Sequence, residues 1–474
     1  MSSQERHSAI FIIGRVVPAL VNLASTAIFT RLASPDAYAT YVVSFASAQI
    51  GSAMLFQWLR QSLLRFSATA DREVVVGTIS AMYALQACVT IGLACLTALF
   101  VGTPFGPLIL VCAAFTLGQA WFDFAQELQR MQMQSKGYGL LFFARALMGL
   151  ILGTATLALT GSGLWLTVAV LTSFLLPPFP FVKGILRNLR YDGGLARRIV
   201  SYGSPLIVST TLSTASMVGD RIVVAYFMDP ASAGQYGPAV DIARQSIFVL
   251  VQGIALAGFP MAIRALEAGD LDGAKRQMRK NAELLLFIAV PATAGLILIS
   301  DEVAGVLLGE EYRSAAQLLL PAAATASFVM CLRSLYFDQA IQLGKRTGLQ
   351  IVTSGAIVIV FIAVSYVAIP RLGILGACLA LLISQCTGAL ASWTLGRSCF
   401  PLPFPAGTLF RICLATLAMF FVVQIFKSSV ILDDVTKLAI MIPMAALVYG
   451  SGVVAMNVLG LKTTIREKIK RRLA

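Results

Sequence analysis

The sequence has few charged residues, one histidine and no closely spaced pair of cysteines. Charged side chains make up 12% of the 474 residues and hydrophobic ones 58%, whereas soluble domains carry roughly 25% charged residues. The single histidine, His7, precedes the first apolar run, which excludes histidine-based catalysis. The eight cysteines form no CxxC pair, so disulfides, zinc sites and metal cofactors have no support. This composition is typical of a protein that is solvated mainly by lipid.

No stretch of the chain is long and polar enough to fold as a soluble catalytic domain. The longest predicted connection, 264–283, reads as a basic interfacial segment. The net charge of +14 is divided among short clusters between apolar runs, without an RNA- or DNA-binding motif. We therefore interpret the charge as a signal of membrane topology and expect neither a nucleic-acid partner nor an enzyme.

Apolar runs long enough to cross a membrane recur along the whole chain. A spanning helix needs about 20 mostly apolar residues. By this criterion we predict fourteen spans, at 9–30, 39–59, 74–100, 107–126, 139–160, 164–182, 200–228, 236–263, 284–300, 315–342, 349–369, 374–396, 409–426 and 438–460. Most of the 36 lysines and arginines fall in alternate connections, and the positive-inside rule then places both termini in the cytoplasm. The first span is predicted to be a retained helix and not a cleaved signal peptide.

A weak internal repeat divides these spans. The segment 32–41 reads LASPDAYATY and 227–236 reads FMDPASAGQY, so that Pro35 matches Pro230 and the final tyrosines also match. Each segment follows the first span of a six-helix group, and an even number of spans separates the two. We therefore predict an all-α polytopic membrane protein with two six-helix lobes in a parallel pseudo-twofold repeat, followed by two C-terminal helices.

The repeat predicts three parts of the chain. They are an N-terminal lobe at 1–190, a C-terminal lobe at 191–400, and the last two spans with a basic cytoplasmic tail at 401–474.

Five arginines lie inside predicted spans. They are Arg15, Arg145, Arg221, Arg244 and Arg333. An arginine in hydrocarbon costs a few kcal/mol, so it normally faces a bundle interior or a watery cavity. Several in one bundle predict a cationic chamber, which a transporter of an anionic substrate would need. Two alternatives stay open: the side chains could extend to the membrane interface, or nearby carboxylates could neutralise them.

Polar amides share helical faces with these arginines. Asn22 lies seven residues after Arg15, and Gln252 aligns with Asp241 and Arg244. We predict that Asn22 and Gln252 belong to the same substrate-binding chamber.

Three aspartates inside the spans are candidates for coupling transport to H⁺ or Na⁺. They are Asp220, Asp241 and Asp338. Intramembrane carboxylates often have this role. Asp338 also lies about one turn beyond Arg333, so it is equally a candidate counter-charge for that arginine.

Residues 201–264 resemble the start of the second lobe in polysaccharide-export flippases of the multidrug/oligosaccharidyl-lipid/polysaccharide exporter superfamily. The matching features are spread along this stretch: Gly203, Pro205, Asp220, Arg221, Gly234, Tyr236 and Pro260. The segments GEEYRSAAQLLLPAA, from Gly309, and TRLASPDAYATY, after the first span, also resemble this family. The resemblance extends over about residues 8–400.

The resemblance implies a flippase with two lobes around a central cationic cavity. Such proteins move undecaprenyl-pyrophosphate-linked oligosaccharides across the bacterial inner membrane by alternating access, for O-antigen, lipopolysaccharide or exopolysaccharide biosynthesis. Arg15, Arg145 and Arg333 would hold the pyrophosphate in the inward state, and Arg221 and Arg244 in the outward state. The implied partners are the lipid-linked substrate, membrane lipids and polysaccharide polymerase or export machinery, with the flippase itself a monomer.

Two other functions remain open at this stage. An ion-coupled multidrug-type antiporter on the same fold is disfavoured. Drug exporters usually handle organic cations, and the five arginines inside the predicted spans do not suit a cationic substrate. A polysaccharide polymerase or glycosyltransferase would need a large outer loop or an acidic metal–nucleotide motif, and the sequence has neither. Val16 follows Arg15, where peptidoglycan lipid flippases of the superfamily usually carry aspartate; this favours an envelope or exopolysaccharide substrate.

Overall fold

The computed structural model describes residues 3–67, 71–102, 105–132, 135–182 and 190–460, with side chains from Pro18 onward apart from positions 105 and 135. These residues are almost entirely helical, and no strand occurs among them. The predicted all-α class is therefore confirmed.

Among the described residues, eleven helices are long and apolar enough to cross a membrane, or twelve if the bent pair formed by α2 (Pro35–Leu55) and α3 (Gln57–Phe66) counts as one span. Two more long helices, α1 (Ser3–Leu32) and α9 (Gly193–Val218), overlap predicted spans but are not among these eleven or twelve. The chain is thus a multi-pass membrane protein, and the predicted total of fourteen spans is not confirmed.

The predicted interfacial segment at 264–283 is not a separate element. α11 (Pro230–Glu267) continues past its beginning and α12 (Leu271–Leu298) starts well before its end, so only three residues join the two helices. The Asp270 side chain accepts a hydrogen bond from the Gly273 N–H at 2.6 Å and caps α12. The basic residues of this region therefore lie on helix ends, which extend the two spans.

The chain divides into two compact units, Met1–Gly237 and Pro238–Ala474. The helices of the first unit that precede α11 are α1, α2 (Pro35–Leu55), α3 (Gln57–Phe66), α4 (Arg72–Val101), α5 (Phe105–Met131), α6 (Ser135–Thr160), α7 (Gly163–Leu175), α8 (Phe179–Val182), α9 and α10 (Asp220–Phe227). The last helix, α11, contributes only its first two turns to this unit.

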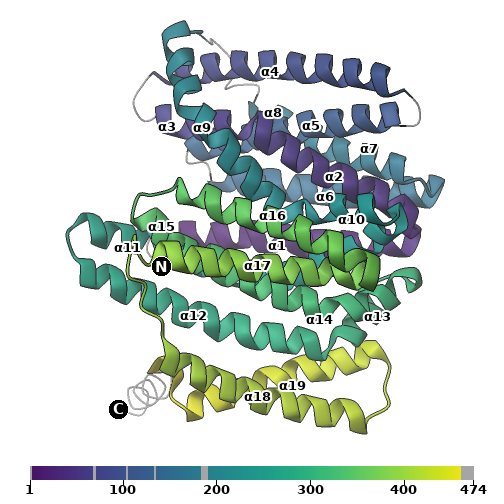
Figure 1. The fold of residues 1–474 in the computed structure, drawn as a ribbon, viewed down its shortest axis with the longest axis vertical. Coiled ribbons are helices and arrows are strands. Elements are labelled where there is room, and N and C mark those ends of the chain that lie inside the picture. The colour runs from purple at the N-terminus through teal and green to yellow at the C-terminus, as the bar shows by residue number, and fades with distance from the viewer. Residues whose placement is uncertain (1–2, 68–70, 103–104, 133–134, 183–189, 461–474) are drawn as a thin grey trace. The chain divides into compact units, whose positions relative to one another are not determined.

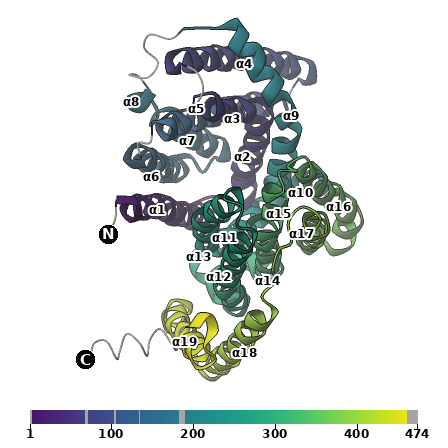
Figure 2. The same cartoon turned by 90° about the vertical axis from the view of Figure 1, so that its left-hand side faces the viewer.

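Helix α2 is the centre of the first unit. It packs against α5, α7 and α9, while α1 packs against α6 and α4 lies alongside α5 (Figure 1 and Figure 2). Close approach requires glycine: a Cβ on Gly163, the first residue of α7, would overlap the Ala37 carbonyl oxygen of α2. The outer flank of α4 remains covered with exposed apolar side chains such as Leu99 and Phe100, as expected for a helix that faces lipid.

The two segments of the internal repeat have the same local structure. Pro35 is the first residue of α2 and Pro230 the first residue of α11, positions at which the missing proline N–H costs nothing. The two helix starts also meet, because a Cβ on Gly234 would overlap the Pro35 carbonyl oxygen, and one on Gly237 would lie 2.9 Å from a Val42 methyl group. Glycine at both positions therefore allows the backbones to cross closely.

The second unit begins inside α11, at Pro238. Its other elements are α12, α13 (Ser300–Leu307), α14 (Glu310–Leu332), the π-helical turn η1 (Arg333–Phe337), α15 (Asp338–Leu343), α16 (Leu349–Leu372), α17 (Ile374–Gly396), α18 (Ala406–Ser429), α19 (Asp434–Ala455) and the 3₁₀ turn η2 (Val458–Gly460). α17 packs against α16 and α14, and α12 packs against α14 and α18 (Figure 1).

The hairpin formed by α18 and α19 is fastened to α12 and α13 near both of its ends. Near one end, Lys427 Nζ donates to the Leu298 carbonyl at 2.9 Å and forms ion pairs with Asp301 and Glu302, each at 3.0 Å. Near the other, Thr408 Oγ1 donates to Glu283 Oε1 at 3.1 Å. These polar contacts fix the hairpin on its neighbours, although its opposite flank is exposed and apolar.

Candidate functional site

Arg145, a predicted substrate-binding residue on α6, is held by an amide and aromatic rings. Its Nη2 donates to Asn22 Oδ1 on α1 at 3.3 Å, so the structure brings two predicted site residues together. The guanidinium carbon lies 4.7 Å from the centre of the Phe174 ring and 5.8 Å from that of Phe122. Among the described residues, no group accepts a hydrogen bond from its buried Nε. Arg145 thus keeps its charge among neutral direct contacts.

A second charged cluster lies beside this arginine, and its residues were not among the predicted site residues. Arg60 of α3 pairs with Asp123 of α5 at 3.1 Å and approaches Glu127 at 3.8 Å. Glu127 also pairs with Arg130 at 3.4 Å. Asp123 is within electrostatic range of Arg145, so the ionic cluster and the Arg145 contacts form one polar region of the first unit.

The Asp220–Arg221 pair is buried at the start of α10, with relative exposures of 4% and 3%. The Tyr236 hydroxyl donates to Asp220 Oδ2 at 3.1 Å. Tyr236 is the final residue of the second repeat segment. Through this hydrogen bond the second segment holds a carboxylate of the preceding helix, α10.

Three hydroxyl side chains of α9 donate to backbone carbonyls of their own helix. Ser216 donates to the Ser213 carbonyl at 2.8 Å, and Ser209 to the Leu206 carbonyl at 3.0 Å. Thr210 also donates to the Ala53 carbonyl of α2 at 3.2 Å. These hydroxyls are therefore satisfied locally, and α9 is joined to α2.

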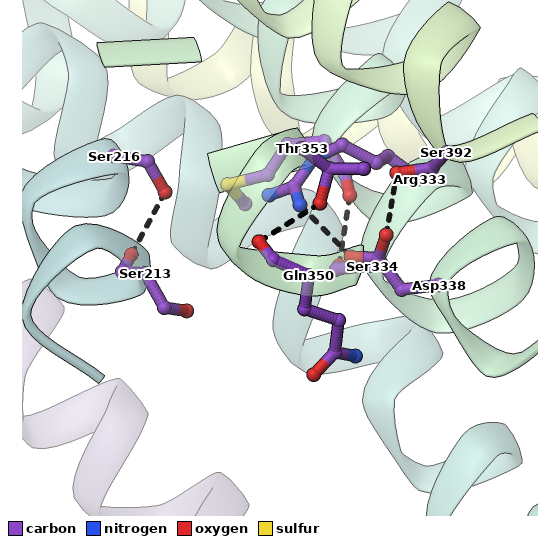
Figure 3. Close-up of polar contacts among 9 residues, drawn as sticks. Ser213, Ser216, Arg333, Ser334, Asp338, Gln350, Thr353 and Ser392 are labelled. Carbon is purple, nitrogen blue, oxygen red and sulfur yellow. Dashed lines mark hydrogen bonds and ion pairs between the residues drawn. The ribbon is translucent and has the colours of Figure 1, made fainter. Parts of the chain in front are cut away.

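Arg333 and Asp338 form a buried ion pair in the second unit. Arg333 Nη1 lies 2.8 Å from Asp338 Oδ2, and the Ser392 hydroxyl of α17 donates to the other carboxylate oxygen at 2.5 Å (Figure 3). All three side chains are nearly inaccessible. Asp338, which the sequence left open as a coupling group or a counter-charge, is the counter-charge in this structure.

The remaining predicted residues of the second unit lie on α11. Arg244, Asp241 and Gln252 are all partly buried. Arg244 and Arg333 both interact electrostatically with the buried Cys331 thiol, which places the two guanidinium groups in one neighbourhood. Arg15 lies within α1, but its side chain falls outside the described residues.

The sequence of this chain matches a known family over most of its length. The family is described as "Polysaccharide biosynthesis protein", and the match extends over residues 28–317. The chain belongs to this polysaccharide biosynthesis protein family. No curated protein is significantly similar to it in sequence.

Solved structures with the same fold are flippases and transporters. The chain is similar to the lipid II flippase MurJ in an inward closed conformation, with a TM-score of 0.77 and 15% identity over 95% of this chain and 99% of that one. It is also similar to an inward-facing multidrug resistance MATE family transporter of the MOP superfamily, with a TM-score of 0.63 and 13% identity over 82% and 97% of the two chains.

A third similar structure is a MOP superfamily transporter from Pyrococcus furiosus, described as having a binding pocket of reverse polarity. Its TM-score is 0.52, with 14% identity over 83% of this chain and 94% of that one. Together these likenesses show that the chain has a MurJ- and MATE-type fold.

Sequence reasoning missed the ionic cluster of Arg60, Asp123 and Glu127. The two carboxylates are four residues apart on α5 and so lie on one face of that helix. That spacing, at the end of an apolar run, was the available signal. It points to a cationic partner on a neighbouring helix, although it does not say which one.

Proposed function

We propose that this protein is a flippase that moves an undecaprenyl-pyrophosphate-linked oligosaccharide from the cytoplasmic to the outer leaflet of the bacterial inner membrane by alternating access. The family match supports a function in polysaccharide biosynthesis. The observation that carries the proposal is the environment of Arg145, a partly buried residue whose guanidinium donates to one amide and lies against two aromatic rings.

Neutral contacts leave the Arg145 charge available to a ligand. A buried cation normally needs an anion or a set of hydrogen-bond acceptors. Arg145 has one modest hydrogen bond, at 3.3 Å, and no acceptor for its Nε among the described residues. A phosphate oxygen would satisfy that donor, and the planar guanidinium can bind phosphate bidentately.

The proposal also assigns a role to each of the other predicted residues. Arg15, Asn22 and Arg333 join Arg145 in holding the pyrophosphate in the inward state, Arg221 and Arg244 accept it in the outward state, and Gln252 contributes a polar contact. Asp220, Asp241 and Asp338 are the candidates for coupling to H⁺ or Na⁺. The lobes 1–190 and 191–400 would move against each other, in a monomer with both termini in the cytoplasm that works with polymerase or export machinery.

The test is complementation in a host that lacks the gene. We would measure surface polysaccharide and the lipid-linked repeat units that accumulate on the cytoplasmic side, for wild type, Arg145→Gln and Arg145→Lys. Arg72→Gln is the matched control, because Arg72 is exposed at the start of α4 and lies outside this polar region.

We expect the host without the gene to lose surface polymer and to trap intermediates, and Arg145→Gln to fail to rescue it at normal expression. Arg145→Lys should rescue partly and Arg72→Gln fully. If polymer export stays normal without the gene while resistance to a cationic drug falls, the protein is a multidrug-type antiporter and the proposal is wrong.

A further inference from the structure

The helix that carries Arg333 is interrupted by a single π-helical turn, and this turn creates the ion pair. The Asp338 N–H bonds to the Arg333 carbonyl, five residues back, which is the π pattern. In a regular α-helix, residues five apart point about 140° away from each other, since one turn takes 3.6 residues. The wider turn instead stacks Asp338 over Arg333, where their side chains meet at 2.8 Å.

The neighbouring helix α17 is shaped to receive this wide turn. Gly388, Ser392 and Gly396 recur every four residues and so form one ridge of small side chains. A Cβ on Gly388 would lie 3.1 Å from Arg333 Cδ, and one on Gly396 would lie 3.3 Å from the Phe337 carbonyl oxygen. Between them, the Ser392 hydroxyl holds the Asp338 carboxylate (Figure 3).

Two polar atoms at this turn remain unsatisfied. Arg333 is 4% exposed and Gln339 is 5% exposed, and within the described ranges neither the Arg333 Nε nor the Gln339 Oε1 has a hydrogen-bond partner. The ion pair therefore uses only part of the guanidinium. A turn type that is often found at functional sites thus holds a cation that still has bonding capacity.

We propose that the π turn is a switch that determines whether Arg333 pairs with Asp338 or with an anionic, phosphate-bearing headgroup. In the π form Asp338 is the resident anion. When the turn relaxes to α-helical geometry, Arg333 and Asp338 rotate onto different faces, and the guanidinium becomes available to the phosphate. Asp338 and Ser392 are positioning residues in this scheme. It rests on the proposed function, whose substrate supplies the phosphate.

The switch predicts that Asp338 competes with the ligand. Bilayer nanodiscs containing the full chain would be titrated with a fluorescent polyprenyl pyrophosphate. Asp338→Asn should bind the probe about tenfold more tightly, because one charge-assisted bond of the competing carboxylate is lost. Arg333→Gln combined with Asp338→Asn should abolish that gain. Asp272→Asn, a change at an exposed carboxylate of α12, is the matched control and should have no effect.

A second measurement needs no ligand. Deleting Leu335 shortens the segment by one residue, so that Arg333 and Asp338 become four apart and remain paired on a regular α-helix. Amide hydrogen exchange over 330–343 should be at least about tenfold slower in this variant than in wild type, because the turn can no longer change register. The deletion should also bind the probe more weakly than wild type.

Several results would overturn the switch. They are an unchanged or weaker affinity in Asp338→Asn, a gain that survives in the double variant, and equal exchange in wild type and the Leu335 deletion. The complementation assay decides the flippase function separately, so that normal polymer export together with any of these results rejects the switch alone.

Discussion

Arg145 in the first unit and Arg333 in the second are held in opposite ways. In the first, Arg145 is contacted directly by Asn22 and by the rings of Phe122 and Phe174. In the second, Arg333 is paired with the Asp338 carboxylate at 2.8 Å. An arginine among neutral contacts keeps its charge for a ligand, whereas a carboxylate neutralises its partner until something displaces it. We therefore expect Arg145 to be available to an anion at all times, and Arg333 only when Asp338 releases it.

The largest effect should come from breaking the carboxylate pair. Asp338→Ala leaves the Arg333 charge buried, which typically costs about 3–5 kcal/mol of stability. We expect a marked fall in the thermal unfolding temperature of the purified protein. Arg333→Met combined with Asp338→Leu should restore stability without restoring polymer export. Equal stability of Asp338→Ala and wild type would mean that the pair is not buried as described.

The neutral contacts of Arg145 predict the opposite behaviour. Arg145→Gln removes a charge without stranding a carboxylate in direct contact, so stability should change little while transport falls by roughly ten- to a hundredfold, the value of a charged hydrogen bond. The assay is the rate of surface polymer formation at matched expression. If Arg145→Gln instead lowers the stability of the protein but leaves export normal, Arg145 has a structural role and the prediction is wrong.

Helix crossing in the first unit gives an effect of intermediate size. Gly234→Ala places a methyl group on the Pro35 carbonyl oxygen and should destabilise the protein by about 1–3 kcal/mol, as overpacking does. Gly253→Ala, on the same helix but with no heavy atom within 4 Å of the added Cβ, is the matched control. The two unfolding temperatures are compared directly, and a fall in the control alone would contradict the close crossing.

The smallest effect concerns the aromatic support of Arg145. Phe174→Leu keeps an apolar side chain but removes the ring 4.7 Å from the guanidinium, at a cost of about 0.5–2 kcal/mol in probe affinity. Phe174→Tyr retains the ring face and should bind the polyprenyl pyrophosphate almost as wild type does. Equal loss in both variants would show that packing, and not the ring, supports the arginine.

The fold class follows from the sequence because bilayer physics leaves few choices. Long apolar runs have no partner for their backbone groups except their own helix, so helices follow directly. The bounds are harder to predict. α12 begins at Leu271, well inside a stretch that reads as a loop, since its basic first turns point to water and hydropathy alone cannot distinguish an exposed helix end from a connection.

The partners of the site residues could not be predicted in the same way. Hydropathy singles out Arg145 and Asn22 separately, but 123 positions separate them, and only the packing of α6 on α1 joins them. The π turn is also invisible locally, because RSLYF contains neither proline nor glycine. The small residues of α17 that pack closely against it lie on another helix and more than fifty positions further along the chain.

The fastening of the α18–α19 hairpin has a practical consequence for imaging. Lys427 and Thr408 bind α18 to α12 and α13 near both of its ends. The short connection between α18 and α19 therefore follows a helix that is held in place. A compact fiducial domain inserted after Ile431, which is fully exposed, would inherit that rigidity. It would give a 50.5 kDa membrane protein an external landmark from which the orientation of its second unit could be measured in single-particle images.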